Sequence, residues 1–461
     1  MRLPSIRDVA PLLAGLPLLI ILPLAGVWLA GYPVHQYLEF PPVTRYVAHA
    51  GFSWPVFIAL AALIVAVVGP FVWRNVRGAK AFRIQGSGFR KENGSGIHNL
   101  QSSISFPLPI TNRQSSIFNL HFPPWGWFGL LLGLVAWILA WTRFAWFAPL
   151  QDFTFSPLWF AYILVVNALT VRRTGRCLMT DRPASFALLF PLSAAFWWFF
   201  EFLNRFVQNW YYVGIGDLSP LQYAIFATLP FSTVLPAVLS TEDFLRSFPT
   251  IGRGVDGTSR FAPIRTPACL PGERRGFPRR LFVTVSRHER PEPEAAPLPG
   301  ATARQHGDPC PRIIPAATLL LAAAGLAGIG VWPDRLFPLL WLSPLLVMTS
   351  AQALAGRPTL FAPVARGDWN RLYRLALAAL ICGFFWEMWN YGSLARWSYT
   401  VPFVNRFHLF EMPILGYAGY VPFGLECAVA AELVVPHLLP ANGPQTTNEE
   451  PGTKNRDLPE T

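Results

Sequence analysis

The chain has 461 residues, of which 52% are hydrophobic and 13% charged, and its formal net charge is +12. A soluble chain carries about a quarter charged residues, so this composition excludes an ordinary soluble domain and favours a membrane protein. The positive charge does not indicate nucleic-acid binding, because the basic residues collect in alternate loops rather than on one basic stripe. The five cysteines form no CxxC motif and no metal-ligand spacing, so neither a metal nor a cofactor is expected.

Apolar runs predict an all-α, polytopic integral membrane helix bundle of about ten transmembrane helices. In chain order the predicted spans are 10–30, 54–73, 125–142, 157–171, 185–203, 221–240, 313–332, 336–354, 373–391 and 411–436. The first run is too long for the apolar part of a signal peptide, which predicts an uncleaved helix.

Arginine is concentrated after the even-numbered spans and sparse after the odd-numbered ones. Because cytoplasmic loops of membrane proteins carry the excess of basic residues, we expect both termini in the cytoplasm. Nearly all the cations are Arg and the chain is rich in Ala and Pro, which is typical of a high-GC bacterial genome. The sequence therefore predicts a multi-pass protein of the bacterial inner membrane.

Composition shifts divide the chain into six predicted segments. They are two leading helices (1–73), a polar cytoplasmic linker (74–124), a first membrane repeat (125–245), an Arg/Pro-rich cytoplasmic linker (246–312), a second membrane repeat (313–440) and a disordered tail (441–461).

The two predicted repeats share an aromatic-rich carboxylate motif. Phe-Phe-Glu-Phe-Leu-Asn at 199–204 returns as Phe-Trp-Glu-Met-Trp-Asn at 385–390, and a Trp/Tyr cluster follows each copy, at 210–212 and 397–399. Glu201 and Glu387 are 186 residues apart, and Pro236 and Pro422 have the same separation. Four spans in each copy predict two parallel four-helix repeats with the same orientation in the membrane.

Each motif places a carboxylate and an amide on one helix face, because residues three apart are neighbours on a helix. Glu201 with Asn204, and Glu387 with Asn390, are therefore predicted to bind a ligand or carry a proton. The alternative is a structural carboxylate paired with a neighbour. Arg205 stands four residues after Glu201 and could fill that role, whereas Tyr391 follows Glu387 at the same spacing.

Glu426 lies deep inside the last predicted span, in a stretch whose prolines and glycines are expected to interrupt the helix. Broken helices at membrane depth usually line a cavity or an ion path. We therefore predict Glu387, Glu426 and Asn390 as catalytic residues. The alternative for Glu426 is a protonated carboxyl group bonded to a backbone carbonyl.

The aromatic residues near the second motif form the predicted pocket wall, and the expected ligand contacts are Trp386, Trp389, Trp397 and Tyr399. The alternative is an interfacial aromatic belt, which is common in membrane proteins. His408 and Glu411 are three residues apart and are included among the ligand-binding residues. Two such side chains on a helix do not by themselves indicate a metal site.

The second half resembles the small integral-membrane lycopene cyclases of carotenoid synthesis. The resemblance rests on Trp386-Glu387, on Trp397-Ser398-Tyr399 and on the later Pro422 to Glu426 stretch, where a single Glu stands in place of that family's pair. It implies duplicated helical units and lipid chemistry. In general character the chain also resembles uncharacterised multi-span bacterial membrane proteins.

Three functions follow from these observations. The first is an enzyme or binding protein for a lipid or isoprenoid in the bilayer, using the intramembrane carboxylates. The second is a proton- or ion-coupled transporter with Glu426 and Glu387 as titrating groups. The third is a non-catalytic membrane scaffold whose Arg-rich loop engages acidic lipid headgroups.

Overall fold

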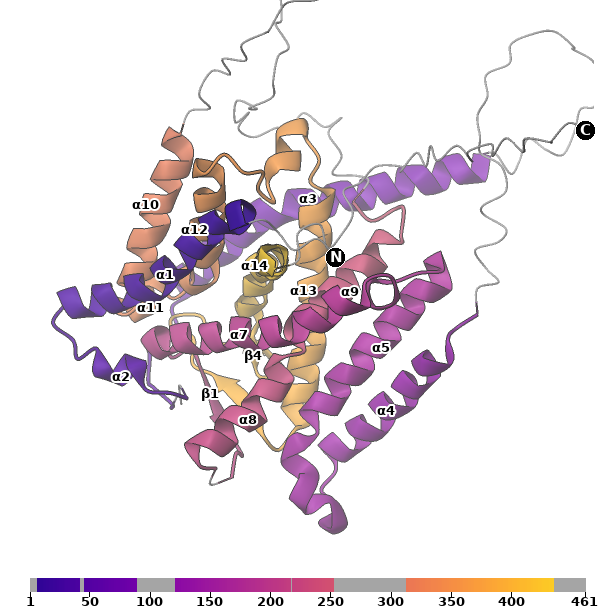
Figure 1. Ribbon diagram of the computed structural model, residues 1–461, viewed down its shortest axis with the longest axis horizontal. Helices are drawn as coiled ribbons and strands as arrows, with labels where there is room; N and C mark the ends of the chain where they lie inside the picture. Colours follow the sequence, from indigo (N-terminus) through magenta and orange to yellow (C-terminus); the bar gives the residue numbers. More distant parts are fainter. Residues whose placement is uncertain (1–5, 42–44, 89–120, 217, 253–311, 435–461) are drawn as a thin grey trace, which may run out of the picture.

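The computed structural model describes residues 6–41, 45–88, 121–216, 218–252 and 312–434. Within them the chain is a predominantly helical bundle with two short two-stranded sheets (Figure 1). The elements up to residue 252 are α1 (Ile6–Leu29), α2 (His35–Leu38), α3 (Trp54–Gly88), α4 (Pro124–Trp141), η3 (Ala145–Phe153), α5 (Phe155–Thr174), α6 (Leu178–Asp181), α7 (Pro183–Val207), β1 (Trp210–Val213), α8 (Pro220–Phe231) and α9 (Val234–Arg246).

The elements after residue 311 are also mostly helical, with more irregular structure near the end. They are α10 (Ile313–Gly328), α11 (Pro333–Leu336), α12 (Leu339–Leu354), η5 (Ala362–Arg366), α13 (Asn370–Gly392), β2 (Arg396–Tyr399), β3 (His408–Leu409), β4 (Met412–Pro413), η6 (Ile414–Gly419) and α14 (Tyr420–Val434).

Seven apolar segments of the described residues are long enough to cross a membrane, and they coincide with seven of the predicted spans. They are 54–77, 124–141, 155–174, 183–207, 220–246, 370–392 and 414–432. The other three predicted spans coincide with shorter apolar helices at 15–29, 313–328 and 339–354. The chain is therefore a multi-pass integral membrane protein. The fourth predicted span, short in the sequence, belongs to α5 and has 20 residues.

Two boundaries differ from the sequence prediction. Helix α3 continues to Gly88, so the first part of the predicted 74–124 linker is helical. The last predicted span is not one helix, because it divides into the β4 strand, the 3₁₀ turn η6 and α14. Most of the two predicted linkers, and the whole 441–461 tail, lie outside the described residues.

Helix contacts follow the same order in two parts of the chain. In the first part α4 packs on α5, and both α5 and α7 pack on α9. In the second part α10 packs on α12, and both α12 and α13 pack on α14. The two parts meet where α13 packs on α9 and α14 on α7, around the fully buried side chains of Trp159, Phe200 and Phe423.

The helix that begins at α8 is broken before α9 at Ser232 and Thr233. Ser193, in the middle of α7, repairs the break: its hydroxyl donates to the Phe231 carbonyl at 2.6 Å and accepts from the Leu235 amide at 3.0 Å. A backbone group without a partner is costly inside a bilayer. The serine therefore lets the chain change direction at depth.

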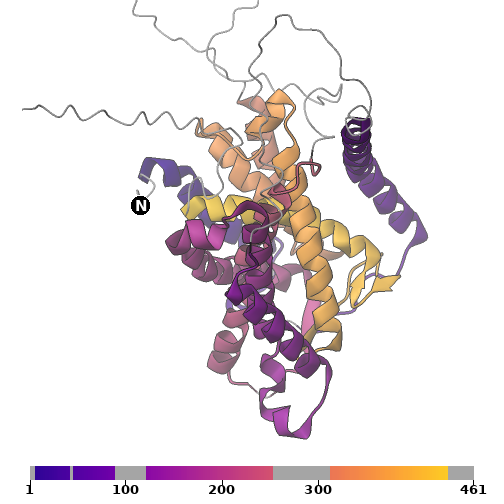
Figure 2. The same ribbon diagram turned by 90° about the vertical axis from the view of Figure 1, so that its right-hand side faces the viewer.

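The outer helices differ in how closely they pack. Helix α1 packs on α10 and α12, whereas α3 lies at the edge of the molecule, apart from the main bundle for much of its length (Figure 2). No residue of 54–77 is buried. Its apolar surface is therefore available to lipid on one side and to the bundle on the other.

Candidate functional site

Glu201 lies near the end of α7 and is fully buried. Its Oε1 atom accepts three hydrogen bonds, from Trp197 Nε1 at 3.0 Å, from Trp210 Nε1 at 3.1 Å and from the Tyr212 hydroxyl at 2.5 Å. One donor stands one turn earlier on the same helix, and two come from strand β1. The carboxyl group therefore joins the end of α7 to the strand that follows it.

Glu387 occupies the corresponding place near the end of α13 and is also fully buried. Its Oε1 atom accepts from the Tyr399 hydroxyl at 2.7 Å and from the Tyr420 hydroxyl at 2.8 Å. The indole N–H of Trp397 donates to the Tyr399 hydroxyl at 2.7 Å. Both glutamates are thus held by aromatic donors rather than by cations.

The asparagines of the two motifs fix the strands that carry these aromatic side chains. Asn390 donates to the Trp397 carbonyl at 2.8 Å and accepts from the Trp397 amide at 2.8 Å. Asn204 donates to the Trp210 carbonyl at 2.8 Å and accepts from the Asn209 amide at 2.9 Å. Each amide satisfies backbone groups of the segment that follows its helix, so both asparagines are positioning residues.

Strands β1 and β2 pair antiparallel and bring the two clusters together. In this register Trp210 is opposite Tyr399, and Tyr212 is opposite Trp397. Residues two apart on a strand point to the same side, so these four aromatic side chains share one face of the small sheet. Side chains from both motifs therefore meet although the motifs are far apart in the sequence.

This face lines a cavity of about 560 Å³. The cavity is bounded by aromatic and aliphatic side chains from α3, α7, α12, α13 and α14, and within the described residues no charged side chain lines it. The lining residues that carry polar groups are Asn209, the tryptophans, and Tyr212, Tyr399 and Tyr420 with their hydroxyls. The carboxyl groups of the two glutamates stand behind these hydroxyls.

Burial governs the chemistry of the two strand tyrosines. It raises the pKa of Tyr212 and of Tyr399 well above the ordinary value, and the neighbouring carboxyl group raises each further. Both hydroxyls therefore keep their protons at neutral pH. The second oxygen, Oε2, of both Glu201 and Glu387 is buried and has no hydrogen-bond partner among the described residues. Each cluster is consequently an uncharged or singly charged hydrogen-bond network in an apolar setting, in which a weak donor is strengthened.

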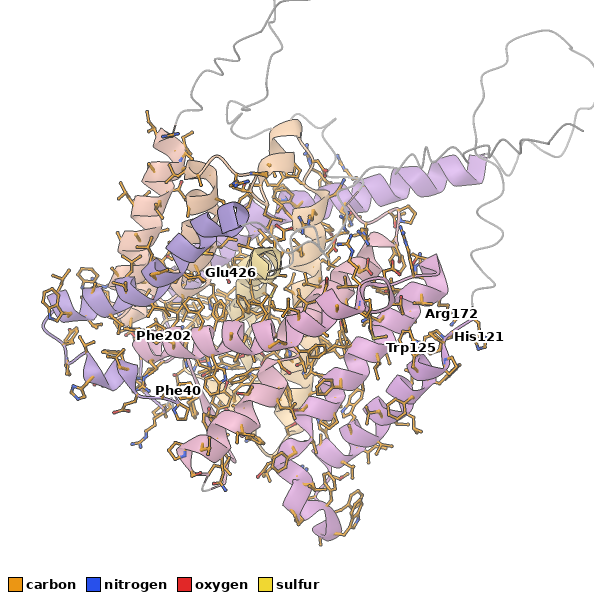
Figure 3. The ribbon with its side chains drawn as sticks, viewed as in Figure 1. Phe40, His121, Trp125, Arg172, Phe202 and Glu426 are labelled. Atoms are coloured by element: carbon orange, nitrogen blue, oxygen red, sulfur yellow. The ribbon has the colours of Figure 1, made fainter. Side chains whose placement is uncertain are left out.

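Glu426 lies on α14, at the centre of the bundle (Figure 3). It is 3% exposed, and its Oε1 atom accepts from the Leu345 amide of α12 at 3.2 Å. Its Oε2 atom has no hydrogen-bond partner in the part of the chain that the structure describes. It does not line the cavity, but Leu345 and Leu425 beside it do. The predicted alternative of a bond to a backbone carbonyl is wrong, because the partner is a backbone N–H group.

The first part of the chain has Ser240 at the position that matches Glu426 by the 186-residue separation. There the partner is a side chain of α5: Asn167 donates to the Ser240 hydroxyl at 2.8 Å. The two parts of the chain thus differ chemically at this matched position, which is a hydroxyl group in the first part and a carboxyl group in the second.

Some of the remaining residues predicted from the sequence line the cavity, and others lie outside it. Trp386 and Trp397 line the cavity, whereas Trp389 is buried behind it against Trp159, with ring centroids 5.3 Å apart. The two-ligand hypothesis for His408 and Glu411 assumed a helix, but these residues belong to the β3–β4 hairpin and its turn.

The nearest partners of this hairpin pair are other side chains. His408 contacts Asn405, with Nε2 and Oδ1 3.2 Å apart, and Glu411 accepts from the Ser398 hydroxyl at 3.2 Å. Within the described residues no group of three or more His, Cys, Asp or Glu side chains could hold a metal ion.

The structural alternative for Glu201 is wrong in its choice of partner. Arg205 turns away from it and donates to the carbonyls of Gln36 and Glu39 next to α2. The sequence reasoning also missed Trp197, Tyr212 and Tyr420 as carboxyl-group donors. Trp197 could have been found from its spacing of four from Glu201, whereas the tyrosines come from other elements.

No protein-family model matches the chain, and neither a curated protein sequence nor a solved structure matches it. The resemblance to lycopene cyclases stays a prediction based on three short motifs.

Proposed function

We propose that this membrane protein binds, and acts chemically on, an uncharged lipid or isoprenoid in the cavity between its two halves. The observation that carries the proposal is the meeting of two buried Glu–Tyr–Trp clusters on one uncharged cavity. Its volume of about 560 Å³ is within the range of about 300–1,000 Å³ for small-molecule sites. An anionic headgroup would find no cation among the described lining residues.

The proposed roles follow from position. The hydroxyls of Tyr212 and Tyr399 contact the ligand, and Glu201 and Glu387 orient these hydroxyls and exchange protons with them. Asn390 and its counterpart on α7 act through the strands. Among the predicted catalytic residues, Glu387 fits best as the acid behind the cavity wall. Glu426 is one layer further back.

A duplication is the simplest origin of the site, and we include it in the proposal. The recurrent order of helix contacts, the paired Glu and Asn residues and their equivalent bonds to the following strands support it. In the same proposal the ten predicted spans are all membrane helices of a bacterial inner-membrane protein with cytoplasmic termini. The excess of Arg after the even-numbered spans supports that orientation.

The alternatives have weaker support. A proton-coupled transporter needs a polar path through Glu426 and Glu432, but Glu432 is paired with Arg371 and an apolar cavity lies between the halves. A scaffold needs carboxyl groups neutralised by Arg and no cavity, whereas Glu201 and Glu387 are bonded to aromatic donors.

The test is mass spectrometry of the lipids that co-purify with the protein and with the Glu387→Gln and Tyr399→Phe variants. We expect one discrete uncharged isoprenoid or lipid, which is depleted in both variants. Glu39→Gln is the matched control, because the Glu39 side chain is 69% exposed and does not line the cavity. Recovery of the same bulk phospholipids from all four proteins would overturn the proposal.

A further inference from the structure

The pairing of β1 with β2 gives the cavity two equivalent hydrogen-bonding positions. In an antiparallel pair, an exchange of the two strands about a central residue pair places each strand on the other. The central pair here is Tyr211 and Ser398. The exchange then places Tyr212 on Tyr399, and it places the tryptophan of β1 on the tryptophan of β2. The sheet that faces the cavity therefore has a local two-fold axis.

The carboxyl groups behind the sheet follow the same relation. The Tyr212 hydroxyl donates to Glu201 of α7. The Tyr399 hydroxyl donates to Glu387 of α13 at 2.7 Å. The two tyrosines are diagonal neighbours in the sheet, which places them about 7–8 Å apart, and each has a carboxyl group of its own. The cavity therefore has two separate hydroxyl–carboxyl relays, Tyr212–Glu201 and Tyr399–Glu387.

Each relay can act toward a ligand as a hydrogen-bond acceptor or as a donor. A tyrosine hydroxyl donates one hydrogen and also accepts, and its hydrogen rotates to suit its partners. While the hydroxyl donates to the carboxyl oxygen, its own oxygen accepts from an O–H group of the ligand. When the carboxyl group carries a proton on that oxygen, it donates to the hydroxyl, which then donates to a ligand carbonyl group. One relay thus fits both oxidation states of a ligand oxygen.

The two relays differ in the other donors to the carboxyl group. Glu201 accepts from two indole N–H groups at 3.0 and 3.1 Å, whereas Glu387 accepts from the Tyr420 hydroxyl at 2.8 Å. An indole N–H group donates and does not accept, so it orients the carboxyl group without competing for the tyrosine hydrogen. Two ligand oxygens would therefore meet the same kind of relay in unequal surroundings.

The rest of the cavity fits a flat ring with an aliphatic tail. Trp341 and Trp210 both line it and are stacked, with ring centroids 5.7 Å apart, and such rings favour a planar neighbour. Helix α3 contributes only Leu, Ile and Val to the lining, from Leu60 to Val68, which is about 12 Å along the helix. The cavity thus has an aromatic part next to the relays and an aliphatic part along α3.

We propose that the ligand is an isoprenoid quinone, bound in both its oxidised and its reduced form. This inference rests on the proposed function, since it names the ligand of the same cavity. A quinone has a flat, uncharged ring, an aliphatic tail and two oxygens on opposite sides of the ring. These oxygens are carbonyl groups in the quinone and hydroxyl groups in the quinol, which are the two partners that a relay accommodates. A polyprenyl alcohol has one oxygen and would leave one relay unused.

The experiment is infrared spectroscopy of a quinone bound to the protein in lipid nanodiscs. The probe is a geranyl-substituted benzoquinone whose two carbonyl carbons are carbon-13, and subtraction of the spectrum of the unlabelled quinone isolates the carbonyl bands. A carbonyl group that accepts a hydrogen bond absorbs at a lower frequency than a free one. The variants are Tyr212→Phe, Tyr399→Phe and the double variant. Tyr391→Phe is the matched control, because Tyr391 is 55% exposed and does not line the cavity.

We expect the carbonyl bands to be shifted to lower frequency in the parent protein and in Tyr391→Phe. Each single variant at a relay should return half of the intensity to the free frequency, and the double variant should return all of it. The affinity for quinone and for quinol should fall about three- to ten-fold in each single variant, because one hydrogen bond is lost. A variant that does not fold would bind no probe, so a half-shifted spectrum also demonstrates an intact cavity.

A second measurement needs no variant. Geraniol has the same tail and a single hydroxyl group, and it should bind to the parent protein at least about ten-fold more weakly than the quinone, because it uses one relay and has no ring. Geraniol that binds as tightly as the quinone would overturn the quinone assignment while leaving lipid binding in place.

Two infrared results would also overturn the assignment: unshifted carbonyl bands in the parent protein, and shifts that remain in the double variant. Absence of binding by both the quinone and geraniol would instead contradict the proposed function itself, so the two failures are distinguishable.

Discussion

Replacement of Asn390 by Ala is the sharpest single test of how the site is assembled. The asparagine is fully buried and makes two hydrogen bonds of 2.8 Å, to the N–H and to the C=O of Trp397. Alanine removes both bonds and leaves two backbone groups without partners. A buried polar group that loses its partner costs about 1–3 kcal/mol, and the two groups of Trp397 are half-buried, so the variant should lose about 1–3 kcal/mol of stability in all.

The measurement is a titration with a denaturing detergent in mixed micelles, followed by tryptophan fluorescence. Asn405→Ala is the matched control, because Asn405 is exposed and its side chain bonds to an exposed residue, His408. The midpoint for Asn390→Ala should fall well below that of the parent, and the control should stay at the parent value. Equal midpoints for the two variants would refute the reasoning.

Three further outcomes are expected from the same titration. Gly424→Ala should cost about 1–3 kcal/mol of stability by overpacking, since an added Cβ would lie 2.2 Å from the Leu375 carbonyl oxygen. Gly419→Ala should be nearly neutral, because its added methyl group would lie 3.6 Å from the nearest neighbouring atom. Tyr399→Phe should cost about 1–3 kcal/mol of stability, because an indole N–H and a carboxyl group lose their hydroxyl partner. Tyr391→Phe should leave the stability unchanged, because Tyr391 is 55% exposed. Burial raises the pKa of Tyr399, so the folded protein holds this proton more tightly than the unfolded chain; its stabilisation is complete below the ordinary tyrosine pKa of about 10 and is lost as the pH rises above it. Alkaline destabilisation should accordingly be smaller in Tyr399→Phe, and an identical pH profile in the two proteins would contradict that account.

Local features of the sequence predicted part of the site. Glu201 and Asn204 are both buried near the end of α7, and Glu387 and Asn390 near the end of α13, as a spacing of three on a helix requires. The sequence did not predict that the two residues of each pair bind different partners. The carboxyl groups face the aromatic donors, whereas the amides hold backbone groups of the following turn.

The interrupted last span was also predictable, because proline and glycine act on their own turn of backbone. Pro413 is the last residue of strand β4, and α14 does not begin until Tyr420. The sequence did not predict what this interruption places together: Tyr420, the first residue of α14, donates to Glu387 on another helix. No periodicity in the sequence links these two positions.

By itself the sequence determined membrane residence, the positions of the apolar helices and the two Glu-x-x-Asn motifs. Hydropathy accumulates over about 20 neighbouring residues, and helical spacing acts over one turn, so both are local quantities. Only the tertiary structure decided that β1 pairs with β2, that the two motifs meet at one cavity and that residues of α3 line one side of it. Those arrangements depend on which apolar surfaces pack together, and inside a bilayer many helix faces are equally apolar, so shape and a few buried hydrogen bonds make the choice.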